Sequence, residues 1–155
     1  MVQLRCASAA WQDLTLPSLF ELKLRAAWPT AEHLQDVRVL LAEERPDALI
    51  VDCLMFGALA ALEGIGVPAM VLVHSAPGAL LPPGGRFEAR LLDSVNHVRA
   101  LVQRPPLARL WAAWEPFATI CTTIRALDPL ADEVPQSFDY IGPGTERVAR
   151  GDWHH

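Results

Sequence analysis

Two short apolar runs separated by a helical pattern constrain this chain more than any other feature. Residues 48–51 read ALIV and are followed by Asp52, and residues 69–73 read AMVLV and are followed by His74. Runs of this length, bounded by turn residues, indicate buried parallel strands. Because residues 56–63 between them suit a short helix, the segment predicts a strand–helix–strand unit with a right-handed crossover.

The rest of the chain continues this alternation of helices and strands. We expect a helix to begin after the N-cap Thr30 and to end at Pro46. The further expected elements are a helix over 87–102, an amphipathic stretch over 107–114, and strands over 117–124 and 138–141. Residues 75–85 hold three prolines and three glycines and are expected to form a surface loop without regular structure. The pattern predicts an α/β fold with a Rossmann-like, mostly parallel sheet and flanking helices.

Composition and charge exclude two classes of partner. Of the 155 residues, 52% are hydrophobic, which is enough for one domain with a sizeable core. The formal net charge is -5 and the 13 Lys and Arg residues form no basic run, so we expect no nucleic-acid binding. No apolar run reaches the roughly 18 residues of a membrane span. Since the N-terminus also lacks the apolar block of a signal peptide, we expect a cytoplasmic protein.

Three cysteines, Cys6, Cys53 and Cys121, form no framework of paired spacings. An odd number without such a framework is typical of free thiols in a reducing cytoplasm. No Cys/His spacing resembles a zinc site, so the sequence predicts no bound metal, and Cys53 is expected to be a small buried apolar residue. The terminal pair His154 and His155 is interpreted as the remnant of a purification tag.

Three passages, in order along the chain, resemble a known family. Residues 45–52 read RPDALIVD, residues 63–72 read EGIGVPAMVL, and residues 138–144 read FDYIGPG. Together they resemble motifs in the N-terminal, acceptor-binding domain of nucleotide-sugar-dependent glycosyltransferases of the GT-B fold. The resemblance covers residues 30–153 and is to the branch that glycosylates antibiotics and other secondary metabolites.

The resemblance implies a two-domain hexosyltransferase of which this chain supplies a part that is inactive alone. Residues 1–144 would form a partial acceptor-binding domain and residues 145–153 the interdomain linker. The family's first strand and the Gly-His-rich loop with its catalytic histidine have no counterpart in residues 1–29, and the donor-binding domain has none either. We therefore expect no cofactor in this chain and a nucleotide-sugar donor for the complete enzyme. The expected partners are a small-molecule acceptor and the missing donor-binding domain.

Asp52 and His74 are the strongest candidates for functional residues. Open α/β sheets bind ligands at the carboxyl ends of their strands, and neighbouring strands lie about 4.8 Å apart, so these side chains can approach one another. The resemblance implies that Asp52 is the catalytic aspartate that orients the family's histidine; the alternative is a cap on the helix over 56–63. For His74 three interpretations stay open: an acceptor-cleft residue, a dyad with Asp52, or a hydrogen bond to loop backbone.

Five further residues are candidates for the wall of an acceptor pocket. Ser75 follows His74 and lacks the Gly-x-Ser-x-Gly elbow of a nucleophile, so it is assigned to the cleft. Apolar and aromatic walls suit flat aglycones, and the residues that would supply them are Met55, Phe56, Trp111 and Trp114. The alternative for each of these four is ordinary core packing, because apolar residues at helical spacing usually pack.

Three functions from different classes stay open on the sequence. The first is the acceptor-binding part of a glycosyltransferase. The second is a stand-alone hydrolase or isomerase that uses Asp52 and His74, and the third is a non-catalytic binding or scaffold module. Without the family's first strand, the strand over 48–51 is expected to be an exposed edge, and such edges pair with other chains. We therefore expect self-association through this edge.

Overall fold

A four-stranded parallel sheet lies at the centre of the computed structural model, which describes residues 28–143. Its strands stand in the order of the sequence: β1 (Leu49–Asp52), β2 (Ala69–Val73), β3 (Ala118–Cys121) and β4 (Phe138–Tyr140). The predicted α/β class with a Rossmann-like parallel sheet is confirmed. Residues 1–27, with Cys6, and residues 144–155, with the predicted linker and the pair His154 and His155, lie outside the described residues.

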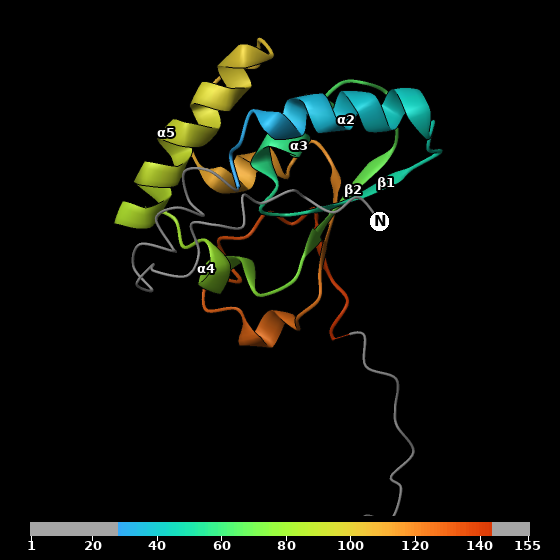
Figure 1. Ribbon diagram of the computed structural model, residues 1–155. Coiled ribbons are helices and arrows are strands. Elements are labelled where there is room, and N and C mark those ends of the chain that lie inside the picture. Colours follow the sequence, from blue (N-terminus) through green and yellow to red (C-terminus); the bar gives the residue numbers. More distant parts are fainter. Residues whose placement is uncertain (1–27, 144–155) are drawn as a thin grey trace, which may run out of the picture.

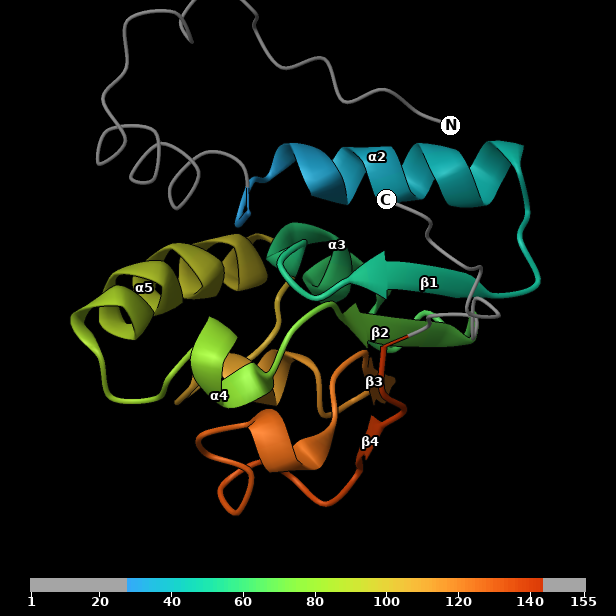
Figure 2. The ribbon, with the colours of Figure 1, turned by 90° about the horizontal axis from the view of Figure 1, so that it is seen from below.

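The larger helices gather on one side of the strands. Figure 1 shows α2 (Glu32–Glu43), α3 (Phe56–Leu62) and α5 (Arg86–Leu101) above the sheet and the one-turn helix α4 (Pro77–Leu80) below it. Two 3-10 turns follow α5, namely η2 (Leu110–Ala113) and η3 (Arg125–Leu127). In Figure 2, β1 and β4 lie at opposite edges of the sheet. Within residues 28–143 none of the helices is long and apolar enough to cross a membrane.

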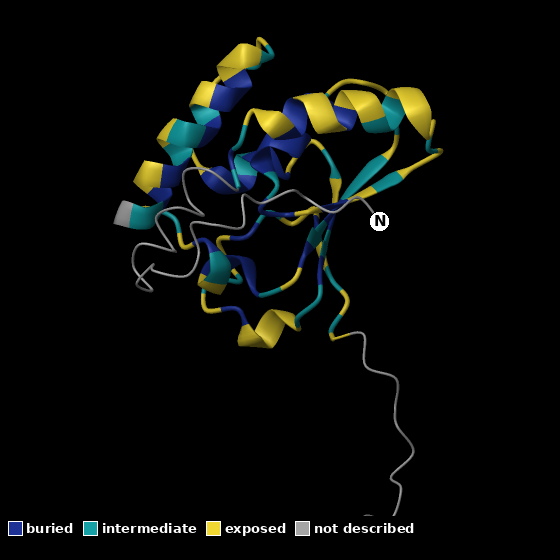
Figure 3. Cartoon of the chain, in the orientation of Figure 1, coloured by how far each residue is buried: buried dark blue, intermediate teal, exposed yellow. Residues whose placement is uncertain are grey.

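Helix α3 lies in the core, and all of its residues are buried. It packs against α2 and α5, and Figure 3 shows the buried residues concentrated where these helices meet the strands. Gly57 permits the close approach of α2, because a Cβ atom there would collide with the backbone carbonyl of Thr30. The apolar character of α3 on every side, which the sequence shows as FGALAAL, follows from this position.

Helix α2 begins close to the residue that the sequence indicates. The hydroxyl of Thr30 accepts a hydrogen bond of 3.3 Å from the backbone N–H of Glu32, which satisfies one of the free N–H groups of the first turn. The helix ends at Glu43, before Pro46. The N-cap is Ala31 and no side chain caps this helix, so the prediction of Thr30 as N-cap is wrong by one residue, whereas the predicted end is confirmed to within three residues.

The prediction that residues 75–85 lack regular structure is wrong for residues 77–80 and holds for the rest of the segment. Pro77 begins α4, where its fixed φ suits the first turn of a helix and its missing N–H is not needed. The backbone N–H of Gly78 donates to the buried carboxylate of Asp128 at 3.1 Å, and Asp128 lies fifty residues further along the chain. A tertiary contact thus fixes a segment whose composition alone indicates an irregular loop.

Strand β1 is an edge strand of the described sheet, and one of its faces is exposed. Among residues 28–143 no strand pairs with its outer edge, as the sequence indicates. The expectation of a fully buried strand is wrong, because Val51 is buried whereas the side chain of Ile50 is 71% exposed. The reason is that the large helices α2, α3 and α5 gather on the other side of the strands (Figure 1).

Candidate functional site

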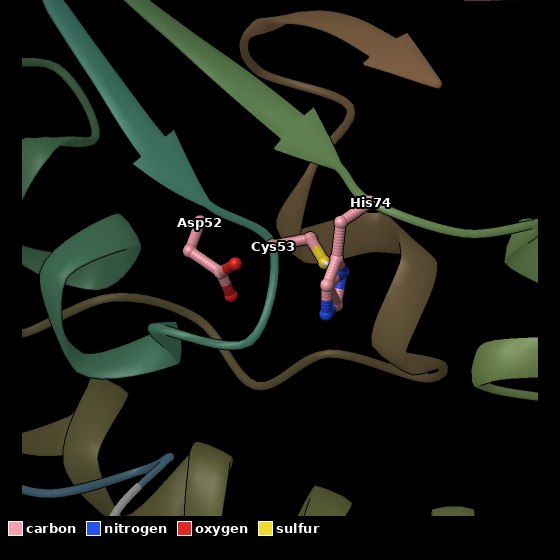
Figure 4. A group of neighbouring side chains, drawn as sticks. All are labelled: Asp52, Cys53 and His74. Atoms are coloured by element: carbon pink, nitrogen blue, oxygen red, sulfur yellow. Dashed lines mark hydrogen bonds between the residues drawn. The ribbon is translucent and has the colours of Figure 1, made fainter. Parts of the chain in front are cut away.

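Three polar side chains meet at the carboxyl edge of the sheet. Asp52 is the last residue of β1, Cys53 follows it, and His74 follows β2. The parallel register pairs Asp52 with Leu72, so the ends of the two strands lie side by side. One ligand atom from each of the three side chains lies within 4.8 Å of the others. Figure 4 shows the Cys53 sulfur directed toward the His74 ring.

Asp52 is exposed and shapes the turn that leaves β1. Its Oδ1 accepts a hydrogen bond of 2.8 Å from the backbone N–H of Leu54, and its own carbonyl accepts one of 3.0 Å from Met55. The N-cap of α3 is Met55, and no side chain caps this helix. The helix-capping interpretation of Asp52 is therefore wrong. Its Oδ2 has no hydrogen-bond partner among residues 28–143, so this oxygen is available to a ligand or a further side chain.

His74 is exposed, and its contact is with the sulfur of Cys53. The Nδ1 atom lies 3.6 Å from the Sγ atom of Cys53, which is a thiol–imidazole contact. Within the described residues no hydrogen bond joins His74 to Asp52 or to loop backbone. The structure therefore brings Asp52 and His74 to one edge, as predicted, without the direct hydrogen bond that a two-residue dyad needs.

Cys53 is fully buried, and its thiol is held in the protonated form. Burial, followed by the negative charge of Asp52, raises the pKa of Cys53 to about 12. Since the thiolate is the reactive form of cysteine, this residue is no nucleophile at neutral pH. Cys53 and Cys121 are both free, as the sequence indicates. Sequence reasoning assigned Cys53 to packing alone, although its place directly after a strand and beside Asp52 is the signal that could have put it in the site.

The predicted pocket residues divide into a core group and an edge group. Trp111, Trp114 and Phe56 are at most 1% exposed and belong to the hydrophobic core. The indole Nε1 of Trp114 donates a hydrogen bond of 2.9 Å to the backbone carbonyl of Cys53. Met55 is half-buried against the core, and Ser75 is half-buried beside His74. The three aromatic residues are therefore packed in the core, whereas Met55 and Ser75 are partly exposed.

A hollow of about 350 Å³ lies away from the predicted site. Its lining comes from α2, α3, the loop before β2 and the end of α5: Arg38, Ala60, Ala61, Ile65, Leu101, Val102, Gln103 and Arg104. None of these is a predicted site residue. The loop that lines it leads into the amino end of β2, whereas His74 follows the carboxyl end, so the hollow and the edge cluster are separate features.

No family model matches the chain, and no curated protein matches it.

Proposed function

We propose that this chain is the acceptor-binding part of a glycosyltransferase. The enzyme would move a sugar from a nucleotide-sugar donor to a hydroxyl of a small natural-product acceptor. One observation carries the proposal: an exposed carboxylate, that of Asp52, ends the edge strand of a parallel sheet whose strands follow the order of the sequence. The three ordered motifs at 45–52, 63–72 and 138–144 supply the resemblance that names the reaction.

The strand order supports an acceptor crevice beside β1. In doubly wound folds each half of the sheet winds outward from a central position where the strand order reverses, and ligands bind outside the carboxyl ends of the strands there. The order β1-β2-β3-β4 is that of one such half, with β1 as its first strand. If further strands pair with the free edge of β1, Asp52 lies at the position where the crevice forms.

Asp52 would act through a histidine that lies outside residues 28–143. A carboxylate beside an imidazole fixes its tautomer and stabilises the imidazolium. The imidazole would take the proton of the acceptor hydroxyl as a general base. The acceptor oxygen then attacks the anomeric carbon, and the nucleoside diphosphate leaves. The free Oδ2 of Asp52 is the atom available for the histidine, because Oδ1 is occupied by the N–H of Leu54.

The nucleotide-sugar would be held by a separate donor-binding domain. Free thiols at Cys53 and Cys121 suit a reducing compartment, so we place the enzyme in the cytoplasm.

Isothermal titration calorimetry of this chain with uridine diphosphate tests whether nucleotide binding belongs to another domain. We expect no tight binding, and micromolar affinity would contradict the assignment of this chain to the acceptor side.

The decisive experiment is Asp52→Asn in the complete enzyme that contains this chain. Asparagine keeps an oxygen that accepts the N–H of Leu54, so the turn is retained while the charge is lost. We expect kcat to fall by about 10²- to 10⁴-fold, the range for lost acid–base catalysis, with the acceptor KM little changed. Asp47→Asn, at an exposed residue before β1, is the matched control and should be neutral. If the kcat of Asp52→Asn stays within about threefold of the parent, well below that range, Asp52 has no catalytic role.

A further inference from the structure

We propose that Asp52, Cys53 and His74 form a binding site for a zinc ion. The three side chains offer a carboxylate oxygen, a sulfur and an imidazole nitrogen from the ends of two adjacent strands (Figure 4). Zinc in proteins is bound by this mixture of donors, whereas magnesium and calcium prefer oxygen ligands alone. The inference does not depend on the transferase function. Because both use Oδ2 of Asp52, the zinc ion and the histidine of that function would compete for this oxygen.

The distance between sulfur and nitrogen fits a tetrahedral zinc ion. Zn–S bonds of about 2.3 Å and Zn–N bonds of about 2.0 to 2.1 Å, at a tetrahedral angle, separate the two ligand atoms by about 3.6 Å. The Sγ atom of Cys53 and the Nδ1 atom of His74 are 3.6 Å apart. One carboxylate oxygen of Asp52 lies within 4.8 Å of the other two ligand atoms, so this exposed side chain needs to approach by at most about 1.4 Å.

The backbone around the ligands is held by bonds outside the cluster. The N–H of Cys53 donates to the carbonyl of Leu72 at 3.2 Å, and the Cys53 carbonyl accepts the indole N–H of Trp114. The N–H of Leu54 holds Oδ1 of Asp52 and leaves Oδ2 for the ion. Contacts of this kind orient metal ligands and raise metal affinity.

The burial of Cys53 determines the route by which the ion enters, and the number of protein ligands determines what occupies its fourth coordination position. Cys53 is buried whereas Asp52 and His74 are exposed, so the ion reaches the sulfur from the solvent side, past the two exposed groups. On binding, the thiol of Cys53 loses its proton to solvent and a zinc–thiolate bond forms. Three protein ligands leave the fourth position of a tetrahedral ion to water. The other explanation of the same 3.6 Å contact is a thiol–imidazole hydrogen bond without a metal.

Cobalt(II), which reports on thiolate ligands by its absorption, separates the two explanations. The chain would carry His154→Ala and His155→Ala to remove the terminal histidine pair as a competing ligand. We expect one equivalent of cobalt to give a thiolate-to-cobalt charge-transfer band that zinc abolishes. Cys53→Ser should remove the band and His74→Ala should weaken cobalt affinity at least about tenfold. Cys121→Ser, at the other buried free thiol, is the control and should change neither.

Three results would overturn the zinc site. They are the absence of a band at equimolar cobalt, a band of full intensity in Cys53→Ser, and unchanged affinity in His74→Ala. Circular dichroism checks that each variant is folded. If Cys53→Ser does not fold, His74→Ala decides, because the exposed side chain of His74 makes no contribution to the core. Because these experiments measure cobalt absorption and not turnover, a negative result disproves the zinc site without testing the transferase proposal.

Discussion

The indole N–H of Trp114 donates a hydrogen bond of 2.9 Å to the backbone carbonyl of Cys53, 61 residues earlier in the chain. This bond links the 3-10 turn η2 to the residue that follows β1, and so it holds the carboxyl edge of the sheet from the core side. A second tryptophan, Trp111, is equally buried, yet its Nε1 has no hydrogen-bond partner among residues 28–143. Comparing these two tryptophans therefore separates the contribution of the hydrogen bond to stability from the contribution of burying an indole.

Trp114→Phe should destabilise the fold more than Trp111→Phe. Both substitutions remove the same atoms from the core, but only the first leaves the carbonyl of Cys53 buried without its donor. We expect the free energy of unfolding to fall by about 1 to 3 kcal/mol more for Trp114→Phe than for Trp111→Phe, the cost of an unsatisfied buried group. Urea unfolding of both variants gives the difference, and equal losses would mean that the bond contributes nothing.

Tyr140 should stay protonated in the folded chain well above pH 10. Burial, and then its hydrogen bond of 2.6 Å to the carboxylate of Asp128, raise the pKa of this phenol. Because the unfolded tyrosine ionises near pH 10 and the folded one does not, stability is lost as the pH rises above about 10. Tyr140 is the only tyrosine of the chain, so phenolate absorbance reports on it alone.

The matched variant for the tyrosine titration is Asp128→Asn, which removes the charge and keeps the shape. In this variant the phenol of Tyr140 should ionise at a lower pH than in the parent, because the charge of Asp128, one of the causes of the raised pKa, is gone. In urea both chains should titrate near pH 10. A parent phenol that ionises near pH 10 while circular dichroism still shows the fold would contradict the prediction.

Acid should weaken the contact between α2 and α3 through His33. This side chain is buried beside Gly57, its Nδ1 has no partner among residues 28–143, and burial lowers its pKa. Below pH 6.5 the unfolded chain binds a proton that the folded chain does not, so stability falls as the pH drops through this range. The slope is at most about 1.4 kcal/mol per pH unit for one proton.

Urea unfolding between pH 7.5 and 5.5 measures this effect. His33→Gln should have a smaller slope of stability against pH than the parent. His97→Gln, at an exposed residue of α5, should keep the slope of the parent. Identical slopes in the parent and His33→Gln would show that another group titrates.

The free edge of β1 should make the chain self-associate. Among residues 28–143 the outer edge of β1 has no strand partner, so its backbone groups can pair with a second copy, and the exposed side chain of Ile50 adds apolar area beside them. Ile50→Lys should shift light scattering toward the monomer, because charged residues on edge strands oppose pairing. Val39→Lys adds the same charge at an exposed residue of α2 and should leave association unchanged. A parent chain that is strictly monomeric at high concentration would refute the prediction.

The elements of this fold could be predicted because their signals are local. The apolar run at 69–73 coincides with β2, and the run FGALAAL coincides with α3, since turn residues stand directly beside each. The alternation of such runs also predicts a parallel sheet. The place of Asp52 and His74 at one edge followed from the same pattern, because parallel strands end on the same side.

Tertiary structure decided the features that depend on residues far apart in the chain. Helix α4 forms in a Pro/Gly-rich segment because Asp128 binds Gly78, 50 residues away. Trp111 and Trp114 are buried in the core, and Cys53 meets His74 across 21 residues. Where turn residues bound an apolar run, as in β2 and α3, local sequence determines the backbone conformation of the element. The register of neighbouring strands and the packing of helices against them fix which distant side chains touch, and these depend on the whole chain at once.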